Sequence, residues 1–140
     1  IVGHFDGPLK TIVTDEVHDG ELASVKTLPE QAVFKLLNPK MPNGPQMMIL
    51  HGDHTKGAFR ALIKVPAGFK APLHTHAAAY AAASLSGSFQ KNDSPALTAG
   101  SIWSQAGEAA HHNACISDTP CIFFVAMDGA FTMAPVKAAE

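Results

Sequence analysis

The stretch GFKAPLHTHAAAYAAASLSG, residues 68–87, decides the fold of this 140-residue chain. It places His74 and His76 one residue apart. Successive side chains on a β-strand point to opposite faces, so on a strand both imidazoles face the same way. Such a pair can offer two nitrogens to a metal ion. The spacing alone is weak support, because a chain with eight histidines contains such pairs by chance.

A third imidazole is available much later in the chain, where His111 and His112 stand next to each other. A histidine from a second strand that joins His74 and His76 would give three ligands on one side of an ion and leave positions open for water or substrate. Only one of two adjacent residues on a strand can face inward. We therefore expect one ligand from this second pair.

Short runs of β-branched, aromatic and aliphatic residues begin near residue 32, and segments rich in turn-forming residues separate these runs. We expect strands at 33–37, 47–51, 59–65, 73–76, 80–90, 101–105, 111–116, 122–127 and 130–133. Short connections of this kind join antiparallel strands. So many short strands must close on themselves or stack as two sheets, because open edges invite aggregation. The sequence predicts an all-β, single-domain jelly roll or small antiparallel β-barrel.

Alanines flank Tyr80 on both sides, and alanine has the highest helical propensity. Pro72 lies upstream of this run and Gly87 downstream, and small side chains suit the interior of a narrow barrel. We therefore expect a strand here, with a short helix as the alternative.

Composition limits the classes of partner. Hydrophobic residues make up 46% of the chain and charged residues 16%, which is enough for one core. We interpret residues 1–27 as an N-terminal arm and 28–140 as the folded domain. A net charge of −2 gives no basic face for nucleic acid. The apolar runs are far shorter than the ~20 residues of a membrane-spanning helix, so we expect no membrane segment.

Two cysteines, Cys115 and Cys121, bracket a turn-like segment. In an oxidising compartment they could form a disulfide, and two buried thiols are the alternative. The sequence leaves the localisation open between the periplasm or exterior and the cytoplasm.

The residues around the histidine pair resemble, in type and spacing, the first motif of the cupin superfamily. That motif is a glycine, five residues, His-x-His, three or four residues, a glutamate, six residues and a glycine. Gly68, His74, His76 and Gly87 match it in type and spacing, and Tyr80 stands at the glutamate position.

The second cupin motif fits in part. Gly100 and His111 match its glycine and its histidine, whereas Ala106 and Glu108 replace its proline and its second glycine. This register favours His111 over His112 as the third ligand. Glu108 could supply the missing carboxylate, although a solvated loop position is the more common role of such a residue.

The resemblance covers most of the chain from residue 28 to 136. Strings at 48–53, 56–59, 66–74 and 128–131 resemble a branch that includes cupins similar to the anti-sigma-factor cupin domain and to an aryl-ketone-cleaving, dihydroxyacetophenone-type dioxygenase. Fold transfers well across such a resemblance, and activity transfers poorly, because cupins support many chemistries.

The resemblance implies one divalent metal ion held by His74, His76 and His111. Tyr80, which replaces the motif glutamate, is our candidate catalytic residue: it could donate a hydrogen bond to a metal-bound species or bind the ion as a phenolate, and a tyrosine that only packs in the barrel is the alternative. Three neutral imidazoles leave the charge of the ion uncompensated, which favours an anionic substrate. By analogy with three-histidine dioxygenases we expect Fe(II) first and Cu(II) second; Zn and Ni also accept imidazole.

We therefore predict a metal-dependent oxidoreductase, dioxygenase-like, that acts on a small anionic or enolisable oxygenated molecule. The alternatives are a non-catalytic sensor of a metal or small ligand, and a metal-dependent lyase or isomerase. We expect a homodimer by family analogy, and because the arm could add a strand to a neighbouring sheet.

Overall fold

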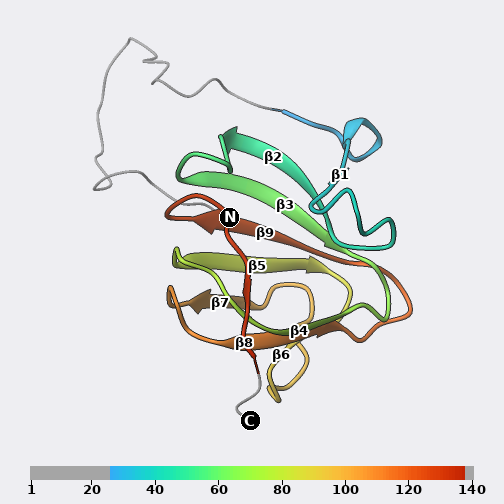
Figure 1. Cartoon of the computed structure of the whole chain (residues 1–140). Helices are drawn as coiled ribbons and strands as arrows, with labels where there is room; N and C mark the ends of the chain where they lie inside the picture. The colour runs from blue at the N-terminus through green and yellow to red at the C-terminus, as the bar shows by residue number, and fades with distance from the viewer. Residues whose placement is uncertain (1–25, 138–140) are drawn as a thin grey trace, which may run out of the picture.

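The computed structural model describes residues 26–137 as two antiparallel sheets and one short 3-10 helix, Pro29–Gln31 (Figure 1). The six-stranded sheet has the order β1 (Lys35–Leu36), β2 (Gln46–Gly52), β3 (Phe59–Val65), β9 (Cys121–Met127), β5 (Tyr80–Ser86) and β7 (Ile102–Gln105). The four-stranded sheet has the order β10 (Ala134–Pro135), β4 (Lys70–Thr75), β8 (His111–Cys115) and β6 (Phe89–Lys91).

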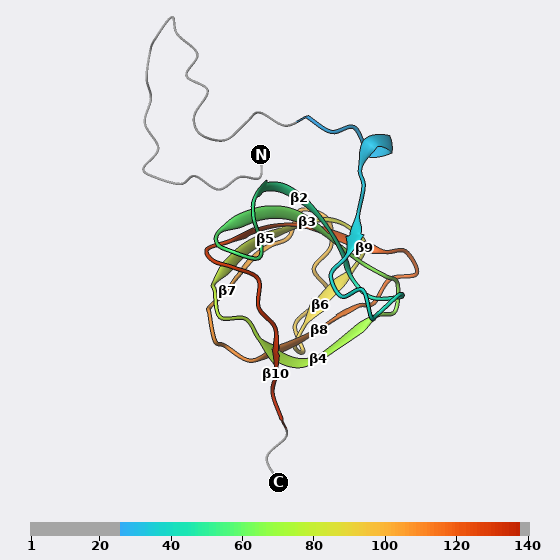
Figure 2. The ribbon, with the colours of Figure 1, turned by 45° about the horizontal axis from the view of Figure 1, so that its top comes forward.

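The two sheets face each other and enclose the core (Figure 2). Strands distant in sequence lie side by side: β9 pairs with both β3 and β5, and β8 pairs with both β4 and β6. These crossovers are those of a jelly roll, so the all-β prediction is confirmed.

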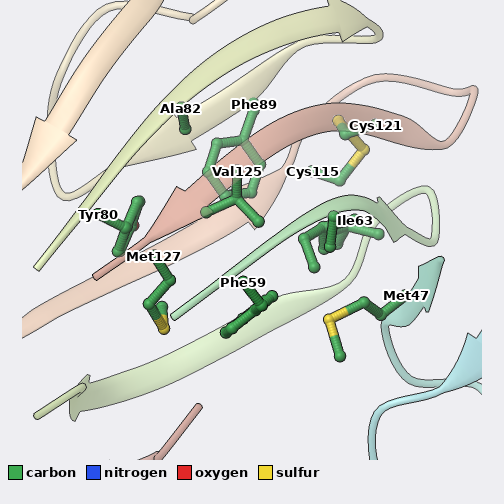
Figure 3. Close-up of a cluster of buried hydrophobic side chains, with 12 residues drawn as sticks. Met47, Phe59, Ile63, Tyr80, Ala82, Phe89, Cys115, Cys121, Val125 and Met127 are labelled. Carbon is green, nitrogen blue, oxygen red and sulfur yellow. A yellow bond between two sulfur atoms is a disulfide. The ribbon is translucent and has the colours of Figure 1, made fainter. Parts of the chain in front are cut away.

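Alternation along the strands builds the core between the sheets. In β3, Phe59, Ala61, Ile63 and Val65 are buried, and the residues between them are partly exposed. This period of two is what a strand with one face in the core requires. Figure 3 shows Phe59 and Ile63 packed with Val125 of β9 in this cluster.

A disulfide joins Cys115 of β8 to Cys121 of β9 and so links the two sheets covalently. Their Cα atoms lie 5.7 Å apart, within the normal range for such a bond. Of the two readings that the sequence left open, the structure shows the disulfide. It lies at the opposite end of the core from Tyr80 (Figure 3).

Two of the predicted strands are wrong in their bounds. The strand expected at 80–90 is two strands in different sheets, β5 and β6, with Gly87 between them at φ 76°. The strand expected at 130–133 is absent from the described residues; the last strand is β10, which pairs with β4. Of the alanines around Tyr80, residues 81–83 lie in a strand, β5, as expected, whereas residues 77 and 78 form a bend before it; the alternative of a short helix is not observed there.

The N-terminal arm expected at 1–27 lies almost entirely outside the described residues, so its boundary stays a prediction. In the part of the chain that the structure describes, no helix has both the length and the apolar character needed to cross a membrane.

Gly87 is a position where we predict a large effect on stability. A Cβ atom there would lie 2.8 Å from the carbonyl oxygen of Pro120 and 2.9 Å from Cα of Cys121. Because the positive φ also disfavours a side chain, Gly87→Ala should lower the free energy of unfolding by about 2–4 kcal/mol. Urea denaturation measures this.

Gly57→Ala is the matched control, since no atom lies within 4 Å of the added methyl group. It should change the free energy of unfolding by less than about 1 kcal/mol. Equal effects at the two glycines would show that the backbone at Gly87 is not constrained as described.

Candidate metal centre

Three histidines from the two predicted pairs meet between strands β4 and β8. His74 and His111 lie directly opposite each other in the pairing of these strands, with ring centroids 4.3 Å apart. His76 follows the last residue of β4, and its ring lies 4.9 Å from that of His74. Each imidazole offers one ring nitrogen, and these three atoms lie within 4.8 Å of one another.

All three side chains are buried: His74 is 2% exposed, His76 9% and His111 0%. Thr75, which stands between the first two, is only partly buried. The alternation that the sequence predicted therefore places both imidazoles on the inner side of the strand.

A backbone carbonyl fixes the tautomer of each imidazole. Nδ1 of His74 lies 2.7 Å from the carbonyl oxygen of Pro72, and Nδ1 of His111 lies 3.0 Å from that of Ala109. A carbonyl oxygen can only accept, so each Nδ1 must carry the proton and donate it.

The third imidazole follows the same rule. Nδ1 of His76 lies 2.6 Å from the carbonyl oxygen of Thr132, far away in the sequence. A neutral imidazole with a proton on Nδ1 has a free lone pair on Nε2. A backbone carbonyl on the other ring nitrogen is the usual support of a metal-ligating histidine.

Nε2 of His111 is buried and has no hydrogen-bond partner among the described residues. Leaving such an atom unsatisfied costs about 1–3 kcal/mol. A divalent ion bound by the three imidazoles would satisfy this nitrogen. The residues present therefore fit a metal ion.

Burial lowers the pKa of His76 and lowers the pKa of His111 to about 4. In both cases the hydrogen bond to a backbone carbonyl opposes this effect, and the nearby positive charge of Lys91 adds to it. Both imidazoles are therefore neutral at neutral pH, which is the form that binds a metal.

Tyr80 begins β5 beside the histidines. It is 8% exposed, and its ring centroid lies 5.9 Å from that of His76 and 6.5 Å from that of His111. Burial raises the pKa of its hydroxyl, an effect that the nearby indole of Trp103 partly offsets. The phenol therefore keeps its proton at neutral pH and can donate a hydrogen bond.

The structure separates two other candidates from this group. The side chain of His112 is exposed, while its backbone N–H donates to Oδ1 of Asn92 at 3.0 Å. Glu108 is also exposed and has a φ of 61°, a left-handed conformation that favours glycine, which is the residue type of the cupin motif at this position. No carboxylate among the described residues joins the three-histidine group.

Sequence reasoning missed Lys91 and Gln105. Lys91 lies just beyond the strand expected at 80–90, yet it is the last residue of β6, half-buried, with Nζ 5.5 Å from the ring centroid of Tyr80. Nζ donates a hydrogen bond to Oε1 of Gln105. The signal was available, because Phe89 is a clear core residue and Lys91, two positions later, shares its face.

Solved structures with the same fold include enzymes and a regulator. The structure of Rhodobacter sphaeroides SigE in complex with the anti-sigma ChrR matches with a TM-score of 0.57 and 24% identity over 72% of this chain. This chain spans about half, 51%, of the length of that chain.

Two further structures match over most of both chains. An RmlC-like cupin protein from Ralstonia eutropha has a TM-score of 0.65 and 17% identity, with 85% of this chain and 80% of that chain covered. The polyketide cyclase RemF from Streptomyces resistomycificus has a TM-score of 0.66 and 13% identity, with 84% and 89% covered. No curated protein shows a significant match to this chain.

The two sheets, the three-histidine group and these structural similarities define a protein of the cupin fold. Within it, the chain belongs to the family described as a domain of unknown function, DUF4437, which matches residues 32–134.

We predict that His111→Ala lowers the affinity for a divalent metal by more than about tenfold. Removing only the hydrogen-bond partner of a metal-ligating histidine commonly lowers the metal affinity by at least about tenfold, and removing the ligand itself should lower it at least as much. His74→Ala should do the same. Elemental analysis of untagged protein after dialysis measures the bound metal.

His112→Ala is the matched control, since this side chain is exposed and adjacent to the ligand in sequence. It should retain the metal. Full metal occupancy in the His111→Ala protein would rule out the site described here.

Proposed function

We propose that this chain is a metal-dependent oxidoreductase of the dioxygenase type that acts on a small anionic or enolisable oxygenated substrate. His74, His76 and His111 would hold one divalent ion, and Tyr80 would be the catalytic residue. The observation that carries this proposal is the convergence of three buried imidazoles, each with its Nδ1 bonded to a backbone carbonyl.

The charge of the centre supports an anionic or enolisable substrate. The three imidazoles are neutral ligands, and no carboxylate among the described residues stands with them. A bound divalent ion would supply a positive charge that stabilises an enolate or phenolate oxygen and a position beside it for oxygen. We place Fe(II) first by the resemblance to three-histidine dioxygenases and Cu(II) second, and imidazole also suits Zn and Ni.

The protein itself would orient and shield the substrate. The Tyr80 hydroxyl keeps its proton and can donate a hydrogen bond to a substrate oxygen near the histidines. The ring of Phe131 also lies beside that of His76, with centroids 5.4 Å apart. Apolar neighbours of this kind exclude water and strengthen polar interactions at the site.

Two other functions have support from the comparisons. Similarity to the structure with the anti-sigma ChrR supports a non-catalytic sensor as one alternative, and similarity to a polyketide cyclase supports a lyase or isomerase as the other. A homodimer stays a prediction.

Oxygen consumption separates these functions. Untagged protein restored with Fe(II) should consume oxygen in an oxygen electrode with at least one member of a panel of β-diketones and hydroxyaryl ketones. Tyr80→Phe should retain the metal and lower kcat/KM about 100-fold, because a hydrogen-bond donor to the reacting oxygen contributes about this much.

His112→Ala serves as the control and should keep the activity. Conversion of a substrate without oxygen uptake would favour the lyase or isomerase. Tight binding of a ligand without any conversion would favour the sensor.

A further inference from the structure

Lys91 brings a positive charge into the barrel close to the three histidines. It is half-buried at the end of β6, on the same face as the buried Phe89. Its Nζ lies over the ring of Tyr80, 5.5 Å from the centroid. The ring of Tyr80 in turn lies 5.9 Å from the ring of His76 and 6.5 Å from that of His111, centroid to centroid, so Lys91 and two of the histidines flank the same side chain.

Gln105 of β7 holds this ammonium in place. Its Oε1 accepts a hydrogen bond from Nζ of Lys91, and its Nε2 donates to the carbonyl oxygen of Ala109 at 3.2 Å. The same carbonyl accepts the Nδ1 proton of His111. A chain of hydrogen bonds therefore connects the ammonium to a predicted metal ligand and fixes their relative position.

The ammonium lacks a negative partner. No carboxylate in the described ranges forms an ion pair with Lys91, and the amide of Gln105 is neutral. An ammonium has three N–H donors, and Gln105 takes one of them. Burying a charge is costly unless a charged partner compensates it. Burial accordingly lowers the pKa of Lys91. In its protonated form Lys91 is a cation without a charged partner in the described part of the chain, near the three-histidine group, and an anionic ligand would compensate it.

We propose that the Lys91 ammonium, held by Gln105 beside the three-histidine centre, binds the carboxylate of a small carboxylic acid substrate. This inference rests on the proposed function and specifies its substrate class. A second oxygen of the same molecule, a hydroxyl or enol oxygen, would lie at the histidines. A carboxylate matches a single ammonium with two free N–H groups, whereas phosphate sites commonly combine several donors.

A purely structural role for Lys91 is the competing explanation. A lysine stem can cover an apolar surface and its ammonium can rest on an aromatic ring, here that of Tyr80. Loss of such packing would lower stability, but it would not change the selectivity of the site for charge. Charge selectivity is therefore the property to measure.

The experiment compares two probes of similar shape that differ in charge, 2-hydroxybenzoate and 2-hydroxybenzamide. Isothermal titration calorimetry on zinc-loaded protein gives the ratio of their dissociation constants. In Lys91→Met the preference for the carboxylate should fall about tenfold, the value of a hydrogen bond to a charged group. Lys91→Arg should preserve most of the preference.

Lys70→Met is the matched control, because Lys70 is exposed on β4, the strand of His74. It should leave the ratio unchanged. Lys91→Gln serves as a second variant in case Lys91→Met does not fold. An unchanged ratio in a folded, zinc-loaded Lys91 variant would overturn the proposal.

Metal-free protein separates this proposal from the proposed function. If the wild-type protein binds no metal, the proposed function fails, but Lys91 can still be tested with the same probes. The metal-free wild-type protein should prefer the carboxylate by about threefold, as expected for a partly exposed pair of charges. Absence of this preference, or its persistence in Lys91→Met, would contradict the role of Lys91.

Discussion

The hydrogen bond between each imidazole Nδ1 and a backbone carbonyl is the constraint on which the site depends. It sets the tautomer, the ring orientation and the direction of the free nitrogen lone pair at once. The carbonyls belong to Pro72, Ala109 and Thr132, which lie in three separate parts of the chain. Thr132 also accepts a hydrogen bond from the backbone of Ala77 through its hydroxyl, so the segment before β10 is tied to the residues that follow β4. The barrel therefore holds these backbone carbonyls in position to orient the three imidazoles.

Charge is the second theme of the site. Burial lowers the pKa of His76 and His111, and the three-histidine group lies near a lysine that has no carboxylate partner in the described part of the chain. The position of the glutamate in the cupin pattern is occupied by Tyr80, whose phenol adds no negative charge. A divalent ion in this setting would make the site strongly positive, and the remaining negative charge would have to come from the substrate. The substitution of a single carboxylate thus connects the ligand set to the class of molecule that we propose.

Sequence patterns predicted the fold and the members of the histidine group. The period of two placed His74 and His76 on one face, and the spacing from Gly100 selected His111 over its neighbour. The rest lay beyond these patterns. The carbonyl partners of the imidazoles have no side-chain signal, since any residue has a backbone carbonyl. The division of the predicted strand 80–90 into β5 and β6 depends on the positive φ of Gly87, and the strand-like residues on both sides of Gly87 gave no sign of it. Because β6 was not predicted as a separate strand, the inward position of Lys91 was not predicted either.

The most direct test of the account is the tautomer of each imidazole in metal-free protein. Long-range ¹H–¹⁵N correlation NMR of protein labelled at histidine nitrogens reports which ring nitrogen carries the proton. At pH 7 we expect His74, His76 and His111 to carry it on Nδ1, and His111 to stay neutral at pH 5, because burial lowers its pKa to about 4. A proton on Nε2 of any of the three histidines, or protonation of His111 above pH 6, would contradict the account.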